Sequence, residues 1–130
     1  MRVLVFGTFD RLHPGHQFFL TEAGKRGELL VVVARDMTVK KVKGRAPMES
    51  EQERLRKVQC TFPQAKVFLG DESDHRRPAR DLHPDLILLG YDQKLPPGVS
   101  LEDLPCSTGR LPAYQPEHFK SSKFREEEKG

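Results

Sequence analysis

The sequence predicts an α/β fold: a Rossmann-like, doubly wound parallel sheet of about five strands with helices on both faces, in a single domain spanning residues 1–130. Short apolar runs alternate with helical stretches along the chain. A run such as residues 29–34 is apolar throughout, as expected of a parallel strand covered on both faces. Polar and glycine-containing segments follow the strand ends, where doubly wound sheets bind ligands.

The individual elements follow from these patterns. Apolar runs predict strands at residues 3–6, 29–34, 66–69 and 86–89, and a fifth, weaker strand is expected around residues 110–113. Helices are predicted at residues 14–26, 50–60 and roughly 78–82. Pro78 must stand in the first turn of the third helix, because a proline further along a helix breaks it.

The second predicted helix carries a clear start signal. Ser50 is followed three residues later by Glu53, the spacing of a capping box in which each side chain bonds the other residue's backbone N–H. Leu55 and Val58 are its expected core contacts, and Cys60 is expected to act as a small buried hydrophobe. These residues therefore define the predicted buried face of the helix.

Composition excludes several classes of protein. No apolar run approaches the roughly 18 residues of a membrane span, so no membrane partner is expected. The N-terminus begins with a strand pattern rather than a signal peptide, which predicts a cytoplasmic protein. Two cysteines are too few for a disulfide framework or a zinc cluster. Aromatic residues are not interleaved with the basic clusters, so a nucleoside triphosphate is the expected anion and nucleic acid is not.

Two histidines mark the most informative position in the chain. His13 and His16 stand where the first helix begins, after a strand and a Gly-Thr-Phe-Asp turn at residues 7–10. The first turn of a helix leaves backbone N–H groups unpaired, and its dipole favours negative charge. Residues at i and i+3 project to one side, so the imidazoles add N–H donors to a phosphate site. The alternative is a chance pair of surface histidines.

The residues around this motif have two interpretations each. Gly7 permits close approach of a phosphate and the Thr8 hydroxyl or N–H can bind its oxygen, although a tight turn alone explains the glycine equally well. Asp10 either orients an amino group, a lysine or a Mg²⁺-bound water, or it stabilises the turn. Arg54 either binds phosphate or pairs with a neighbouring carboxylate.

Residues 7–16 read Gly-Thr-Phe-Asp-x-x-His-x-Gly-His and resemble the signature of the HxGH-motif nucleotidyltransferase superfamily, most closely its small cytidylyltransferase-like family. The resemblance implies transfer of a nucleotide monophosphate from ATP or CTP onto a phosphate or phosphorylated small molecule, with release of pyrophosphate. It implies catalytic roles for His13 and His16, and nucleotide-binding roles for Thr8, Phe9, Asp10 and Gly15.

A basic stretch follows the second predicted strand. Lys40, Lys41, Lys43 and Arg45 are expected on a flexible loop that neutralises triphosphate charge. Such a run is ordinarily a solvated face, but the family resemblance implies functional lysines here. Lys43 is the candidate catalytic residue and Lys41 the candidate nucleotide contact.

A second tetrapeptide closes the fourth predicted strand. Gly90 permits close ligand approach, while Asp92 and Gln93 offer hydrogen-bonding atoms that read a base edge or bind ribose. An ordinary strand-to-loop turn is the alternative. Residues 90–93, Gly-Tyr-Asp-Gln, resemble the archaeal-type FAD synthases more than the glycerol-3-phosphate cytidylyltransferases.

The C-terminal segment resembles the second superfamily signature, ISSTxIR. It departs from that pattern at Lys120, where the pattern has serine, and at Phe124, which replaces isoleucine. Ser121 and Ser122 are implied nucleotide contacts at a helix start, and Arg125 is an implied catalytic residue that reaches the β- or γ-phosphate. Without the first motif, the segment would be interpreted as an exposed polar helix.

Together the resemblances imply an FMN adenylyltransferase, which moves AMP from ATP to the phosphate of FMN to give FAD and pyrophosphate. Mg²⁺ is the implied cofactor, bound mainly through the triphosphate and water. One alternative is a cytidylyltransferase acting on CTP and glycerol 3-phosphate or a related phospho-alcohol, and another is a non-catalytic nucleotide-binding module. The family also suggests a homodimer.

Overall fold

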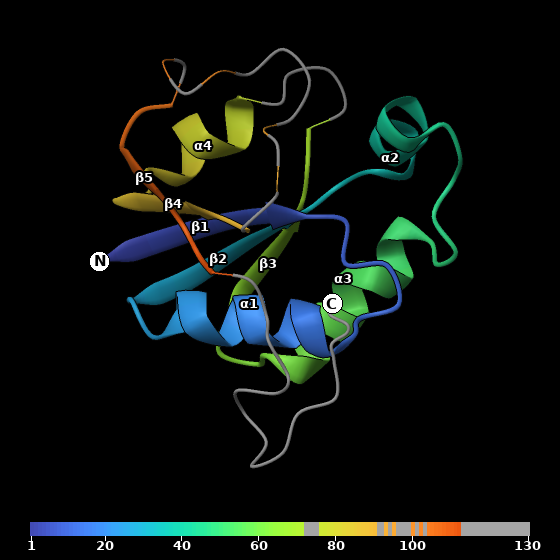
Figure 1. The fold of residues 1–130 in the computed structure, drawn as a ribbon, viewed down its shortest axis with the longest axis horizontal. Coiled ribbons are helices and arrows are strands. Elements are labelled where there is room, and N and C mark those ends of the chain that lie inside the picture. Colours follow the sequence, from blue (N-terminus) through green and yellow to red (C-terminus); the bar gives the residue numbers. More distant parts are fainter. Residues whose placement is uncertain are drawn as a thin grey trace.

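A strand near the N-terminus forms the centre of the sheet. The computed structural model describes residues 1–71, 76–90, 93, 95, 100, 102 and 104–112. Strand β1 (Arg2–Gly7) lies between β2 (Glu28–Val33) and β4 (Leu86–Leu89), with β3 (Lys66–Leu69) and β5 (Ser107–Arg110) outside them. The order is β3-β2-β1-β4-β5 and every pair is parallel (Figure 1). The predicted five-stranded parallel α/β sheet is confirmed.

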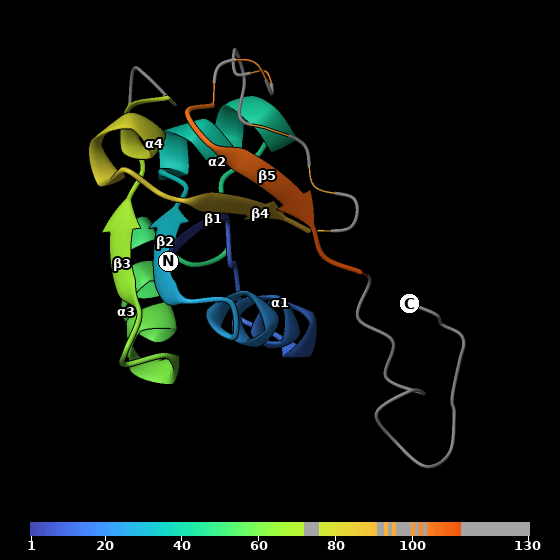
Figure 2. The same ribbon diagram turned by 90° about the vertical axis from the view of Figure 1, so that its left-hand side faces the viewer.

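Helices cover both faces of the sheet, as the doubly wound prediction requires. Figures 1 and 2 show α1 (Pro14–Gly24) and α3 (Glu51–Thr61) on one face and α4 (Arg77–Leu82) on the other. Because successive strand side chains point to opposite faces, β1 contributes Val3 and Val5 to one core cluster and Leu4 and Phe6 to the other. The first cluster includes Leu20 and Ala23 of α1 and Val58 of α3, whereas the second includes Ala79 of α4.

The fifth strand lies earlier than predicted. It covers Ser107–Arg110 instead of residues 110–113. β5 is an edge strand with mostly exposed side chains, so it has no apolar run to mark it. Leu111 is buried, and its N–H donates to the carbonyl of Leu89 at 2.8 Å just after the strand.

The three lysines of the basic stretch do not lie on a loop, so this prediction was wrong for them; Arg45 follows the helix that carries them. A helix, α2 (Asp36–Lys43), carries Lys40, Lys41 and Lys43 in its last turn, where cations interact favourably with the helix dipole. The helix ends at Gly44, whose φ of 79° is left-handed and suits glycine. Val39 is the one buried residue of α2, so the helix has no run of core-facing positions from which it could be predicted.

The start of α3 confirms the capping box. The Ser50 hydroxyl accepts from Glu53 N, and the Glu53 carboxylate accepts from Ser50 N. Val58 is fully buried as expected, whereas Leu55 is only partly buried. Cys60 is exposed, so its assignment as a buried residue was wrong. In the part of the chain that the structure describes, every helix is too short or too polar to cross a bilayer.

Candidate active site

The carboxyl ends of the strands open into one large cavity. Its volume is about 720 Å³, within the range of small-molecule sites. The cavity is lined by residues that follow four strands, among them Thr8 after β1, Arg35 after β2, Gly70 after β3 and Gly90 after β4. Parallel α/β sheets bind ligands at this edge, particularly where the strand order reverses, which here is between β1 and β4.

Most of the predicted site residues share this cavity. It is lined by Thr8, Phe9, His13, Gly15, His16, Lys43, Gly90 and Gln93. Asp10 and Lys41 do not line it. Asp92, Ser121, Ser122 and Arg125 lie outside the described residues.

The two histidines cap their own helix. His13 is the N-cap of α1, and its Nδ1 accepts from Gly15 N at 3.1 Å and His16 N at 3.3 Å. In return, Nδ1 of His16 accepts from His13 N at 3.3 Å. The pair therefore forms a capping box with imidazoles in the places of the usual serine and glutamate. The expectation of unpaired amides was wrong for Gly15 and His16, because the ring of His13 occupies both.

This capping arrangement determines where the ring hydrogens lie. A nitrogen that accepts a hydrogen bond carries no hydrogen, so in both rings Nδ1 is bare and Nε2 carries the N–H. The rings stack with centroids 3.6 Å apart and an interplanar angle of 18°. The prediction that both imidazoles project to one side is confirmed, and each ring retains its Nε2–H as a donor.

The environment of His16 favours the neutral ring. Burial is the main cause that lowers the pKa of His16 to about 4; the nearby His13 and Lys43 also act to lower it, and Asp10 opposes them. A neutral His16 donates through Nε2 without adding a second charge beside Lys43. The ligand-free site is therefore less positively charged than its residue types suggest.

We expect the His16 ring resonances to titrate with a midpoint near 4 in NMR spectra of the ligand-free protein. Its folded pKa lies below the ordinary 6.5, so His16 favours the folded state above pH 6.5, and this contribution is lost as the pH falls toward about 4. The His16→Gln variant identifies the resonances by their absence. A midpoint close to 6.5 would contradict the assignment of a buried, neutral ring.

The Phe9 side chain packs against His16. Its ring packs edge-on against the His16 ring, with centroids 5.5 Å apart, and is buried. Phe9 has a left-handed φ of 54°. A Cβ on Gly7 would lie only 2.5 Å from the Phe9 ring, so the glycine is required to admit that ring. This packing accounts for Gly7 without a phosphate contact.

Asp10 stabilises the backbone. Its two carboxylate oxygens accept from Met48 N at 2.8 Å and Glu49 N at 3.0 Å, ahead of α3. Burial raises the pKa of Asp10, but these two N–H groups, together with Arg54 and Lys43, hold it below the ordinary value. The turn-stabilising interpretation therefore has direct structural support, and a nucleotide contact by Asp10 stays a prediction.

Arg54 is fully buried, and its hydrogen bonds within the described part of the chain join groups that hold the site together. Its guanidinium donates to the Thr8 carbonyl at 2.8 Å, the Glu49 carbonyl at 3.0 Å and Oδ1 of Asp36 at 2.7 Å. Arg54 thus joins the turn after β1 to the starts of α2 and α3. Of the two interpretations left open by the sequence, pairing with a carboxylate is the one observed.

Hydrogen bonds hold Gly90 and Gln93 in place at the switch point between β1 and β4. The Gln93 side chain accepts from Gly90 N at 2.9 Å and donates to the Phe6 carbonyl at 2.8 Å. Arg110 donates to the carbonyls of Gly90 and Gln93. Both ends of the Gln93 amide are therefore bonded to backbone, which leaves its second N–H and the remaining lone pair of its oxygen for a ligand.

The contribution of α2 to the cavity wall was not predicted. Thr38, Val39 and Val42 line the cavity beside Lys43. Val42 stands four residues after Thr38 and three after Val39, a helical spacing that was a signal for this face, but the helix had to be recognised first.

Two stacked imidazoles at a helix start and a lysine, together at the carboxyl edge of a doubly wound sheet, define a nucleotidyltransferase type of site. The sequence model of the cytidylyltransferase-like family matches residues 4–127, and the chain belongs to this family.

Individual relatives agree with this assignment. The FAD synthase of Methanosarcina barkeri (strain Fusaro / DSM 804) is 43% identical over 117 residues, which cover 85% of this chain and 83% of that protein. The FAD synthase of Archaeoglobus profundus is 50% identical over 95 residues, covering 72% of this chain and 59% of that protein. The crystal structure of the lipopolysaccharide core biosynthesis protein from Thermoplasma volcanium GSS1 superposes with a TM-score of 0.77 at 34% identity, covering 88% of this chain and 98% of that one.

Proposed function

We propose that the chain is an FMN adenylyltransferase, which transfers AMP from ATP to the phosphate of FMN and releases pyrophosphate. The observation that carries this proposal is the stacked pair His13 and His16 in the large cavity of a chain similar to archaeal FAD synthases. The pair supplies donors for a triphosphate, and the relatives indicate the acceptor.

The reaction needs no general base from the protein. A phosphate monoester has a second pKa near ~6 and is largely dianionic at neutral pH. One of its oxygens forms a bond to the α-phosphorus of ATP in line with the bond to the bridging oxygen, which breaks as pyrophosphate leaves with the electron pair. Catalysis then depends on positioning and on stabilising charge.

Three side chains supply that stabilisation in the proposed mechanism. The Nε2–H groups of His13 and His16 donate to phosphate oxygens, and the Lys43 ammonium adds positive charge from the facing helix. Because the capping box fixes both rings, little reorganisation is needed as charge develops on the bridging oxygen.

Mg²⁺, when bound with the nucleotide, would neutralise part of the triphosphate charge. No group of three or more His, Cys, Asp or Glu side chains able to hold a metal occurs among the residues that the structure describes. The cavity's donors are N–H groups that suit phosphate oxygens, so we expect the ion to be held by the phosphates and water.

Further roles belong to this proposal on the strength of the family resemblance. Residues assigned to nucleotide binding are Thr8, Phe9, Asp10, Gly15, Lys41, Gly90, Asp92, Gln93, Ser121 and Ser122. Arg125 is assigned to the β- or γ-phosphate. A single catalytic domain over residues 1–130, a cytoplasmic location and a homodimer complete the proposal.

Supplying two substrate pairs in parallel tests the function. With ATP, FMN and Mg²⁺ we expect FAD and pyrophosphate to form in equal amounts, measured by chromatography of the flavins. CTP with glycerol 3-phosphate should react at least about tenfold less efficiently, a difference of about 1.4 kcal/mol. A preference for the CTP pair would assign the chain to the cytidylyltransferase alternative, and no turnover with either pair would favour a non-catalytic module.

A further inference from the structure

The cavity extends to both sides of the histidine pair. Since β1 is central, residues after β4 and β5 lie on one side of it and residues after β2 and β3 lie on the other. We call the first side the β4 half (Gly90, Gln93, Leu95 and Pro112) and the second the α2 half (Arg35, Thr38, Val39, Val42, Gly70 and Pro78). A transfer reaction at the histidine pair must hold both substrates at once, with the reacting phosphorus between the acceptor oxygen and the departing pyrophosphate.

The β4 half suits the adenosine of ATP. The strand order reverses between β1 and β4, and doubly wound sheets bind nucleotides at this switch point. With adenosine in the β4 half, the part of the cavity left for the acceptor is the α2 half, over the ends of β2 and β3.

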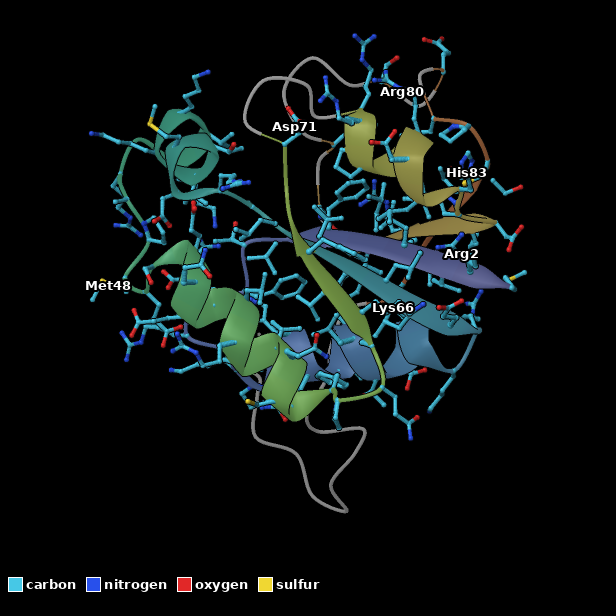
Figure 3. The ribbon with its side chains drawn as sticks, turned by 180° about the vertical axis from the view of Figure 1, so that it is seen from behind. Arg2, Met48, Lys66, Asp71, Arg80 and His83 are labelled. Atoms are coloured by element: carbon cyan, nitrogen blue, oxygen red, sulfur yellow. The ribbon has the colours of Figure 1, made fainter. Side chains whose placement is uncertain are left out.

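The α2 half has room for a large acceptor. A second cavity of about 500 Å³ adjoins it and shares Arg35, Gly70, Asp71 and Pro78 with the first. Figure 3 shows Asp71 at the carboxyl end of β3, beside α4, and Lys66 at the opposite end of the strand. An acceptor longer than its phosphate group can therefore continue past β2 toward α4.

The wall that α2 presents to this half is apolar next to its cation. Thr38, Val39 and Val42 line the cavity beside Lys43. Val42 is 57% exposed, although it lies on a short helix whose last turn is otherwise basic. Met37, on the same helix and 69% exposed, does not line the cavity. A cavity wall that places an apolar side chain beside a lysine suits a ligand that joins a phosphate to a flat ring.

We propose that the α2 half binds the isoalloxazine ring of FMN, with Val42 in direct contact with the ring and Lys43 near its phosphate. This assignment rests on the proposed function. It makes Val42 a residue that determines acceptor specificity, because a small phospho-alcohol has no ring to place against it.

The test places the same charge at two positions of α2, one that lines the cavity and one that does not. Val42→Glu should raise KM for FMN by about tenfold or more, because a carboxylate replaces the apolar contact, and should raise KM for ATP several-fold less, because the adenosine lies in the β4 half. Met37→Glu adds the same charge outside the cavity and should leave both constants within about twofold. Val42→Ile, which keeps a β-branched apolar side chain, should retain the parent's KM for FMN. FMN binding is measured independently by quenching of flavin fluorescence.

The outcomes separate this inference from the function itself. If the parent forms FAD and Val42→Glu binds FMN as well as the parent does, or if Met37→Glu weakens FMN binding equally, the assignment of the ring to the α2 half is wrong while the function stands. An equal rise in KM for ATP in Val42→Glu would also overturn the assignment, because the nucleotide would then bind in the α2 half. If the parent neither binds nor adenylylates FMN, both proposals fail.

Discussion

Replacing His16 by alanine should lower kcat by roughly 30- to 1,000-fold, which corresponds to about 2–4 kcal/mol of lost transition-state stabilisation, the range for one oxyanion donor. The Nε2–H of His16 is proposed to bind charge that develops as pyrophosphate leaves, so ground-state binding should suffer less. We therefore expect KM for ATP to change by no more than about threefold. Steady-state assays of FAD formation give both constants.

His13 needs a control that separates capping from catalysis. His13→Ala removes the acceptor for two backbone N–H groups, so it should also destabilise the fold by about 1 kcal/mol, the usual cost of a lost N-cap. Asparagine is a good N-cap residue, so His13→Asn should recover that stability without recovering kcat. If His13→Asn is as active as the parent, or if both alanine variants stay within a few-fold of it, the histidines do not act as catalytic donors.

The sequence was sufficient to predict the interior of the fold. β1, β2 and β4 are covered on both faces, so nearly every residue in them must be apolar, and such runs are visible without a structure. β5 lies at the edge with mostly exposed residues, and α2 buries Val39 alone, so neither presents the long apolar run of a central strand. The two elements that were misplaced or missed are therefore ones that bury little of their surface.

The functional site was also only partly predictable from the sequence. The HxGH spacing was enough to place His13 and His16 at a helix start, but residue types alone do not reveal which ring nitrogen accepts from the backbone. Arg54 was ambiguous for a related reason, since a guanidinium binds carbonyls, carboxylates and phosphates alike. Its role depends on burial, and burial of a charged residue runs against its ordinary preference for the surface.

Replacing Arg54 by alanine should have the largest effect on stability, about 3 kcal/mol, at the low end of the cost of breaking a buried ion pair. The Thr8 and Glu49 carbonyls would each lose their guanidinium donor and a cavity would replace a large buried side chain. The low end applies because the side chain of Asp36, its carboxylate partner, is 41% exposed and can regain water. Urea denaturation followed by circular dichroism gives the free energy of unfolding.

Arg56 provides the matched control for this prediction, because it lies on the same helix and is exposed. Arg56→Ala should change the free energy of unfolding by no more than about 0.5 kcal/mol, as surface substitutions generally do. Arg54→Lys keeps the charge but cannot reach three acceptors in one plane, so it should lie between the parent and Arg54→Ala. Equal stability of Arg54→Ala and Arg56→Ala would show that the three contacts contribute nothing net. In that case, the turn carrying Thr8 would be held by its own packing, with Phe9 against Gly7 and His16, rather than by the guanidinium.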